Sequence, residues 1–187
     1  MRIISGFLKG KKILQPKDLF TRPLKDMVKE SIFNIISHSN KFNVSIKNSN
    51  ILDLFSGVGS FGIECLSREA KKVFFVENYA NVLPVLKTNL TKLGLNENSK
   101  IFEFDIENKE NLNIFDKKFD IIFLDPPFKT KNCNQLILNI FEKNLLEKNG
   151  IIVIHRHKNE NEILSDSFKI FEEKKYGLSK IFFLGLH

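Results

Sequence analysis

The length, composition and charge of this chain place it among ordinary globular proteins. Its 187 residues suit one domain, and 42% hydrophobic with 27% charged residues excludes a disordered, collagen-like or membrane-spanning chain. The N-terminal apolar run is too short for a secretory signal, so we expect a cytoplasmic protein with no membrane partner. Cys65 and Cys133 lack metal-ligand spacing, so we expect both to be reduced packing residues.

The net charge of +7 is concentrated near the N-terminus. Residues 1–30 hold eight basic and three acidic side chains, a net of +5. A basic segment beside a nearly neutral body suits attraction to phosphate groups, and the expected contacts are Arg2, Lys9, Lys11 and Lys12. An excess of lysines is more often explained by an ordinary solvated surface than by binding. Attraction to phosphate groups and surface solvation therefore both stay open here.

Residues 1–40 are predicted to form an N-terminal extension. Two short strands, 2–5 and 12–14, flank a basic turn that contains Gly6 and Gly10. Apolar residues at helical spacing then run to about Ser37, with Thr21 as the predicted N-cap. The polar stretch 39–50 separates this extension from residues 41–187, which we predict to form the main domain.

The main domain is predicted to alternate strands and helices. The expected strands are 51–55, 72–77, 101–105, 119–124 and 150–155, with helices at 61–69, 80–93 and 134–146. Segments 168–173 and 180–184 look like a closing antiparallel pair. Repeated β-α units indicate a parallel sheet covered on both faces, with ligands at the carboxyl ends of its strands.

A glycine turn follows the first of these strands. Gly57, Gly59 and Gly62 fit G-x-G-x-x-G, and Glu77 stands twenty residues beyond Gly57, where it can accept hydrogen bonds from a ribose. This spacing serves NAD and S-adenosyl-L-methionine equally. Asp53 favours the second, because a carboxylate beside the turn repels a pyrophosphate and attracts a sulfonium and an ammonium group.

The segment Asp125-Pro126-Pro127-Phe128 directly follows a buried strand. Two prolines cannot continue a ladder, so the chain leaves the sheet in a stiff turn that holds Asp125 at the strand's carboxyl end. The Asp125 carboxylate and the Pro126 carbonyl can accept the two N–H groups of an exocyclic base amine, which directs the nitrogen lone pair at a methyl group. Phe128 offers a surface on which an extruded base can stack.

Motifs along the whole chain resemble one known family. The glycine turn with Asp53 and the Asp-Pro-Pro-Phe segment looks like the amino-methyltransferases of nucleic acids, which include adenine-N6 and guanine-N2 enzymes. The N-terminal motifs narrow the resemblance to the bacterial RsmD family, whose members are 16S rRNA (guanine(966)-N(2))-methyltransferases. These motifs are Met1-Arg2-Ile3-Ile4-Ser5-Gly6, Lys9-Gly10-Lys11-Lys12-Ile13 and Thr21-Arg22-Pro23, with Asp53-Leu54-Phe55-Ser56-Gly57 and Tyr176-Gly177 further on.

The resemblance implies a fold, a cofactor and a substrate. The expected fold is α/β and Rossmann-like, with a seven-stranded, mainly parallel sheet, an antiparallel C-terminal strand and an N-terminal β-hairpin that engages RNA. The implied cofactor is S-adenosyl-L-methionine, the partner is 16S rRNA in a small-subunit assembly particle, and we expect a monomer. The implied cofactor-binding residues are Asp53, Phe55, Gly57, Gly59, Glu77, Asp105 and Ile106. Asp125, Pro126, Pro127 and Phe128 would hold the amine, and Arg22 would lie near the active-site mouth.

Two departures from the family and three alternatives complete these expectations. Val58 stands in the glycine turn where many relatives carry a small polar residue, and we expect no effect on the chemistry. A strand ends in His155-Arg156-His157 where an acidic residue is common, and we expect this to leave the chemistry untouched. Without an evident third ligand, we treat both histidines as surface residues and expect no metal site. The alternatives are a DNA adenine-N6 methyltransferase, a non-catalytic RNA-binding assembly factor and an NAD-dependent oxidoreductase.

Overall fold

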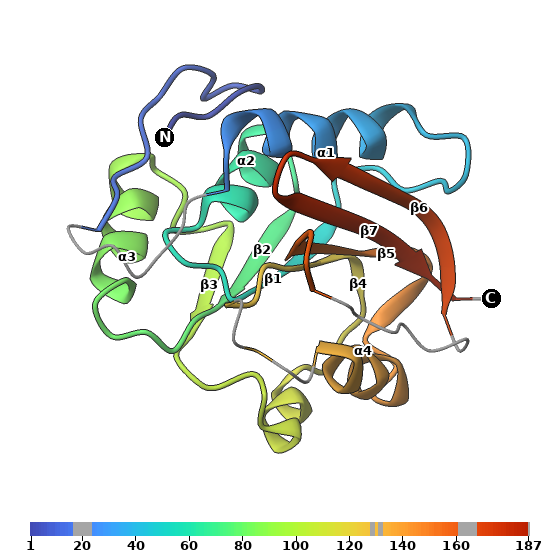
Figure 1. The fold of residues 1–187 in the computed structure, drawn as a ribbon. Helices are drawn as coiled ribbons and strands as arrows, with labels where there is room; N and C mark the ends of the chain where they lie inside the picture. The colour runs from blue at the N-terminus through green and yellow to red at the C-terminus, as the bar shows by residue number, and fades with distance from the viewer. Residues whose placement is uncertain (17–23, 128–129, 131–132, 161–167, 187) are drawn as a thin grey trace.

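A computed structural model describes residues 1–16, 24–127, 130, 133–160 and 168–186 (Figure 1). Within them, seven strands form one sheet in the order β3-β2-β1-β4-β5-β7-β6. The first five strands of that order are parallel, while β7 is antiparallel to both β5 and β6, which confirms the predicted sheet. The strands are β1 (Asn50–Leu54), β2 (Lys72–Val76), β3 (Ser99–Phe102), β4 (Phe119–Leu124), β5 (Leu146–His157), β6 (Lys169–Tyr176) and β7 (Ser179–Gly185).

Helices cover both faces of the sheet, as Figure 1 shows. One face carries α1 (Asp26–His38), α2 (Ser60–Ser67) and α3 (Leu83–Lys92), and the other carries α4 (Cys133–Glu142) and the 3-10 helix η1 (Lys109–Ile114). Side chains alternate along each strand, so in β4 Phe123 joins the first core and Leu124 the second. Burial on both faces explains why the central strands are almost wholly apolar.

The structure differs from the predictions at the end of β3, at the start of α1 and in the segment before β4. Strand β3 ends at Phe102, so Asp105 lies in the following turn. Helix α1 begins at Asp26 with Lys25 in the N-cap position, so Thr21, which lies outside the described residues, is not its N-cap. The helix η1 was not predicted. None of the described helices is both long and apolar enough to cross a membrane.

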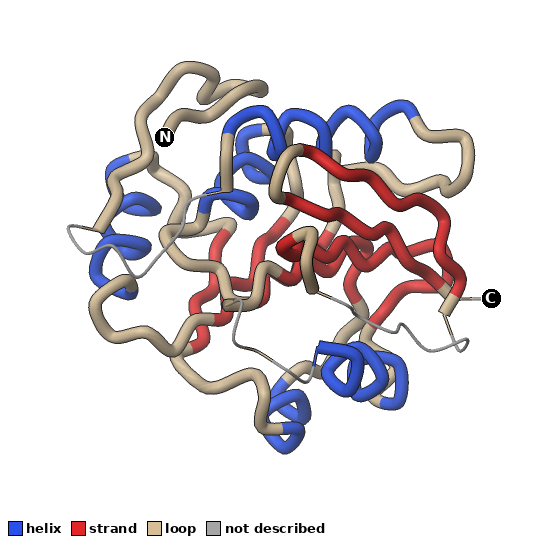
Figure 2. The backbone as a smooth tube through the Cα atoms, in the orientation of Figure 1, coloured by secondary structure: helices blue, strands red, loops and turns tan. Residues whose placement is uncertain are grey.

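The expected N-terminal hairpin is mostly a loop, as Figure 2 shows. Antiparallel pairing is limited to one bridge, Arg2 with Lys12. The physical reason is that the backbone N–H groups of Ile4 and Ser5 donate to the Glu64 carboxylate on α2, at 2.7 and 2.9 Å, and cannot build a strand ladder. The side chains of Ile3 and Ile13 are nevertheless buried in the core on the face that carries α1 and α2.

Candidate active site

The glycine turn links β1 to α2 in a conformation that requires glycine. Gly57 and Gly59 have φ values of +55° and +85°, which other residues rarely adopt. Gly59 is the N-cap of α2, and its own backbone N–H donates to the Ser56 carbonyl. At Gly62, a Cβ atom would stand 2.3 Å from the Phe75 ring, so this glycine lets α2 pack closely on β2. The turn therefore sits rigidly at the carboxyl edge of the sheet.

Asp53 lies buried on β1 beneath this turn. Its side chain is on the sheet face covered by α2, and Oδ2 accepts a hydrogen bond from the Gly62 N–H at 3.0 Å. Burial raises the pKa of Asp53 well above its usual value, and the nearby carboxylates of Asp125 and Glu77 raise it further. A cation bound at this edge would offset all three effects.

Glu77 fastens the glycine turn to the end of β2. Its Oε2 accepts from the Gly57 N–H at 2.7 Å, and its Oε1 accepts from the Asn78 and Tyr79 N–H groups, both at 2.9 Å. A carboxylate has about four lone-pair positions, so Glu77 can still accept one hydrogen bond from a ligand hydroxyl.

Some of the predicted cofactor residues line one small pocket beside Glu77. The lining residues are Phe55, Val76, Glu77, Asn78, Phe104 and Ile106. The pocket volume is about 10 Å³, which is room for one water, so a purine base would enter only if Phe55 or Phe104 moved. Asp105 is not among these residues. Its exposed carboxylate accepts from the Glu107 N–H at 2.9 Å.

A larger pocket of about 330 Å³ lies at the opposite edge, where β1 and β4 begin. Its walls include Lys47, Asp120 and Lys148. Ligands of open α/β sheets bind outside the carboxyl ends of the strands. The glycine turn and the converging acids lie at that end, so we place the active site there rather than in the larger pocket.

The carboxyl edge fits a cationic ligand with polar groups. Three carboxylates, those of Asp53, Glu77 and Asp125, converge on it. The Ser56 hydroxyl is buried in the turn and has no hydrogen-bond partner among the described residues. At Gly57 nothing lies within 4 Å of the place where a Cβ would stand, so a ligand can approach the backbone there.

Asp125 follows β4 at this edge, and His155 on the neighbouring strand contacts its side chain. The Asp125 Oδ1 lies 2.8 Å from Nδ1 of His155, and the Asp125 side chain keeps 25% of its surface exposed. Pro126 is buried and Pro127 is exposed, while Phe128 lies outside the described residues. The backbone beyond Asp125 is anchored too, because the buried Arg156 guanidinium donates to the carbonyls of Pro127 and Thr130, at 3.4 and 3.0 Å.

The prediction that His155 is a surface residue is wrong, while the expectation that the His155-Arg156-His157 segment leaves the chemistry untouched stays a prediction. His155 contacts the Asp125 carboxylate, and its side chain is only 13% exposed. Parallel pairing of Leu124 with Ile154 places the next residues, Asp125 and His155, side by side. That register was the signal that sequence reasoning lacked. Among the described residues, no group of three or more acidic, histidine or cysteine side chains could hold a metal ion.

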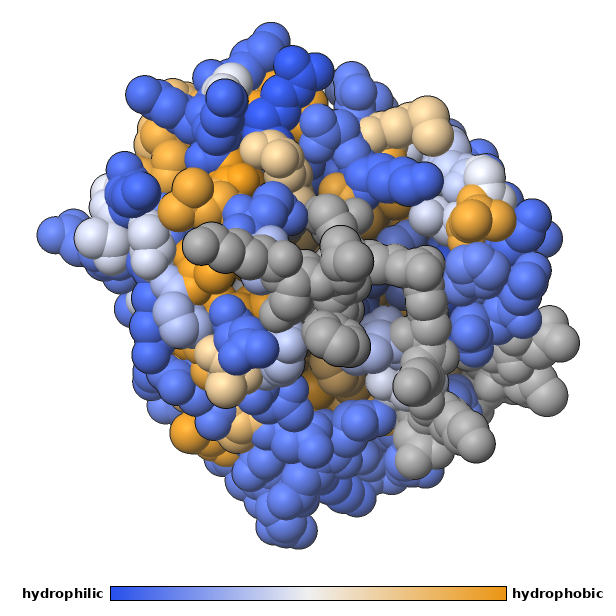
Figure 3. Space-filling view, turned by 60° about the vertical axis from the view of Figure 1, so that its left-hand side comes forward, coloured by the Kyte–Doolittle hydropathy of each residue, from blue (hydrophilic) through white to orange (hydrophobic). Residues whose placement is uncertain are grey.

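The basic segment, residues 1–16, lies on the outside of α1, α2 and α3. Lys9, Lys11 and Lys12 are exposed, and Phe7 in the same segment is 66% exposed. Arg2 is exposed and pairs with Asp26 at 3.6 Å, while Arg22 lies outside the described residues. Figure 3 shows a face on which hydrophilic side chains predominate and hydrophobic side chains gather on the left.

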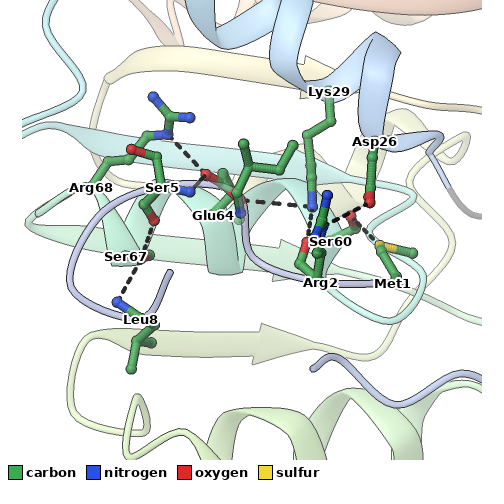
Figure 4. A network of polar contacts seen from close by, with 12 residues as sticks. Met1, Arg2, Ser5, Leu8, Asp26, Lys29, Ser60, Glu64, Ser67 and Arg68 are labelled. Carbon is green, nitrogen blue, oxygen red and sulfur yellow. Dashed lines mark hydrogen bonds and ion pairs between the residues drawn. The ribbon is translucent and has the colours of Figure 1, made fainter. Parts of the chain in front are cut away.

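A buried polar network fastens the basic segment to α1 and α2 (Figure 4). Glu64 lies at its centre, with Arg68 Nε at 3.0 Å and Lys29 Nζ at 3.7 Å, and Lys29 also donates to the Arg2 carbonyl at 2.8 Å. On α3, the Asn89 amide donates to the carbonyls of Leu14 and Val58. The basic segment and the glycine turn therefore share one support.

The fold and the site together define a class of protein. A sheet of order β3-β2-β1-β4-β5-β7-β6, with a glycine turn after β1 and acids at the carboxyl edge, is the fold of the S-adenosylmethionine-dependent methyltransferases. The family described as conserved hypothetical protein 95 matches residues 1–185. The chain belongs to this family, the RsmD family.

Individual relatives agree with this assignment. The chain is 33% identical to the ribosomal RNA small subunit methyltransferase D of Haemophilus influenzae over 183 residues, which cover 95% of this chain and 90% of that protein. The Escherichia coli structure yhhF, described as a methyltransferase, is similar with a TM-score of 0.83 and 26% identity over 100% of this chain and 98% of that one. The structure of SMU.776, described as complexed with SAH, is 15% identical over 84% of this chain and 48% of its own, with a TM-score of 0.67, and shows the fold alone.

Proposed function

We propose that this protein transfers a methyl group from S-adenosyl-L-methionine to the exocyclic N2 amine of a guanine in 16S rRNA, at the position of the 966 type. The observation that carries the proposal is the placement of Asp125, partly exposed at the carboxyl edge beside Asp53 and Glu77. The name of the Haemophilus influenzae relative supports a ribosomal RNA substrate. The guanine assignment rests on the resemblance of the motifs.

In this proposal, some residues at the carboxyl edge bind the cofactor and others bind the target amine. When bound, the cofactor supplies a methyl group on a positively charged sulfur, which is already a good leaving group. Asp53 and Glu77 would contribute negative charge beside it. Glu77 would accept hydrogen bonds from its sugar hydroxyls, and the Ser56 hydroxyl could donate to or accept from its amino-acid portion. Phe55 and Ile106 line the pocket for its base.

Asp125 and the Pro126 carbonyl act on the target amine. Their oxygens accept its two N–H groups, which holds the nitrogen lone pair in line with the methyl group. With the cofactor bound, the nitrogen would gain the methyl group and release one proton, and the sulfur would keep the electron pair of its former bond to carbon. Asp125, as an acceptor of one N–H of the amine, would take up that proton. Phe128 provides the stacking surface for the extruded base.

We assign residues 1–40 to RNA binding. Lys9, Lys11 and Lys12, with Arg2 and Arg22, would contact phosphates, and the exposed Phe7 ring is suited to stack on an unpaired base. The substrate would be a small-subunit assembly particle, met in the cytoplasm by a monomer of this protein. The shared support of the basic segment and the glycine turn would keep the RNA and the cofactor in fixed relation.

Methyl transfer from labelled cofactor onto unmodified small-subunit particles tests the proposal. We expect label on one guanine of 16S rRNA, mapped by primer extension and mass spectrometry. Asp125→Ala should remove most of this activity and leave cofactor affinity, measured by calorimetry, within a few-fold of the wild-type value. Label on duplex DNA or no methyl transfer to any ribosomal particle would refute the proposal, and absence of cofactor binding would favour a non-catalytic assembly factor.

A further inference from the structure

We propose that His155 is a positioning residue for the reaction: its Nδ1–H donates to the Asp125 carboxylate and fixes the oxygen that receives the target amine. The proposal rests on the function proposed above. Two hydrogen bonds carry it, from His155 Nδ1 to Asp125 Oδ1 at 2.8 Å and between His155 Nε2 and Ser179 Oγ at 2.9 Å. Both ring nitrogens therefore have a partner, which leaves the imidazole one orientation.

The partners determine which nitrogen of a neutral His155 carries the proton. An ionised carboxylate only accepts hydrogen bonds, so the Nδ1 that faces Asp125 must be the donor. The Nε2 then accepts from the Ser179 hydroxyl, which can donate. Asp125 thus selects the Nδ1–H tautomer, because the partner of one ring nitrogen sets the state of the other, and the Ser179 hydroxyl is able to donate to the remaining Nε2.

The direction of this chain of contacts separates it from a hydrolase triad. In a serine hydrolase the carboxylate is buried behind the histidine and the serine faces the substrate. Here Asp125 is the member of the chain that lies near Asp53, and its side chain keeps 25% of its surface exposed, so the carboxylate is the end that faces the proposed site. In the sheet order β1-β4-β5-β7, His155 on β5 and Ser179 at the start of β7 lie on the side of β4 away from Asp53.

The same contacts explain why Asp125 needs support. The terminal torsion of an aspartate is broad, so a carboxylate with no fixed partner samples many orientations. Among the described residues, His155 is the one that donates to the Asp125 side chain. With Oδ1 occupied, Oδ2 is left for the amine. Losing this bond would misplace the acceptor, and misplacement of about 1 Å at a reacting centre costs about a hundredfold in rate.

Two substitutions of similar polarity separate positioning from packing. In His155→Asn, the amide nitrogen stands where Nδ1 stood and can still donate to Asp125. In His155→Gln, the longer side chain carries its amide to the place of Nε2 and reaches Ser179 instead. We expect kcat for methyl transfer to ribosomal particles to fall about a hundredfold in His155→Gln and less than about tenfold in His155→Asn, with KM for the cofactor unchanged in both.

His157→Gln is the matched control, because His157 lies two residues further along the same face of β5. It should have the wild-type kcat. Thermal unfolding of each variant shows whether it is folded. If the wild type is active and His155→Gln keeps its kcat, or His155→Asn is as slow as His155→Gln, the proposal is wrong. If the wild type transfers no methyl group to any particle, the proposed function has failed instead.

Nitrogen NMR of the wild-type protein tests the contact without any assay of activity. We expect the neutral ring of His155 to show the Nδ1–H tautomer. His157 provides the internal comparison, because its Nδ1 accepts from the Asn159 N–H at 3.3 Å and its neutral ring should carry the proton on Nε2. The Nε2–H tautomer at His155 would overturn the proposal even in an active enzyme. Asp125→Asn, whose amide can donate to the ring, should abolish the tautomer preference.

Discussion

Two buried acids beside α2 have opposite surroundings. Glu64 on α2 faces the basic segment and is fully buried, yet it has Arg68 and Lys29 beside it and accepts from the Ile4 and Ser5 N–H groups. Asp53 on β1 is buried to the same degree, but one backbone N–H donates to it and its charged neighbours are two further carboxylates. The buried charge of Glu64 is therefore compensated by its partners, whereas Asp53 has no positively charged partner among the described residues.

This difference distinguishes support from function. A buried charge is tolerated when partners replace its lost hydration, and Glu64 meets this condition. Burial lowers the pKa of Lys29, while the nearby carboxylates of Glu64 and Asp26 act against that. For Asp53 the missing compensation is what a sulfonium or ammonium group would bring. We therefore expect Asp53 to destabilise the free protein and to strengthen the binding of the cofactor.

The largest expected effect comes from removing the compensated acid. Glu64→Ala leaves the buried Lys29 without its main partner and strips two backbone N–H groups of their acceptor. We expect a loss of about 3–5 kcal/mol in the free energy of unfolding, measured with denaturant. Glu142→Ala is the control, since its pair with Lys109 at 2.7 Å is exposed and should contribute less than about 1 kcal/mol. A Glu64→Ala variant as stable as this control would show that the network is dispensable.

Replacing the uncompensated acid, Asp53, should change the free energy of unfolding in the opposite direction. Asp53→Asn keeps an oxygen for the Gly62 N–H and removes the buried charge. We expect the free energy of unfolding to rise by about 0.5–2 kcal/mol, while affinity for S-adenosyl-L-methionine falls at least about tenfold. Thermal unfolding and calorimetry measure the two quantities. Affinity for SAH, which lacks the sulfonium charge, should fall less. Equal losses for both ligands would argue that Asp53 acts through shape and not through charge.

The pH dependence of stability sharpens the same contrast. Because the folded pKa of Asp53 is raised above the unfolded value of about 3.9, the folded state keeps a proton that the unfolded state releases. The retained proton on Asp53 contributes to the free energy of unfolding. This contribution is fully present below a pH of about 3.9 and is lost as the pH rises through the folded pKa of Asp53. The stability advantage of Asp53→Asn over the wild type should therefore grow with pH and then level off. Groups common to both proteins cancel in the difference. A difference that is flat with pH would contradict the raised pKa.

Local patterns predict most of the fold, and long-range pairing explains what they miss. The bounds of β4 follow from its apolar run, which stops just before two prolines. The predicted β3 is too long because Phe104 continues the apolar alternation, but its ring packs on Phe102 and Phe115 after the strand has ended. The alternation there reflects an aromatic cluster and not a ladder.

The candidate site also contains some features that local patterns predict and others that depend on long-range pairing. Local spacing is enough to single out the glycine turn, Asp53, Glu77 and Asp125, and the structure brings them to one edge, although their roles stay predictions. His155 was missed because its contact with Asp125 depends on the register between β4 and β5. The partners of Glu64 were missed for the same reason, since Lys29 and the N-terminal backbone lie far from it in sequence.

The smallest expected effect on stability, and a separate one on RNA, comes from the surface of the basic segment. Lys11→Glu with Lys12→Glu changes two exposed side chains, so the free energy of unfolding should shift by less than about 0.5 kcal/mol. Removing one interaction between a lysine and a phosphate should reduce the slope of log affinity against log salt by about 0.7–0.9, so the double variant should flatten it by about 1.4–1.8. Salt titrations of RNA binding measure this slope.

Lys47→Glu with Lys148→Glu makes the same change of net charge at the opposite edge of the sheet, where both residues line the larger pocket. If RNA is held by the basic segment, this control should lower affinity slightly through net charge and keep the wild-type slope. Equal slopes for the two double variants would mean that the charge of the whole protein, and not the segment fastened by Glu64, attracts the RNA. In that case the Glu64→Ala variant, assayed where it remains folded, should bind RNA at least as tightly as the wild type, because it is one charge more positive. Loss of its RNA affinity would show that Glu64 supports substrate binding as well as stability.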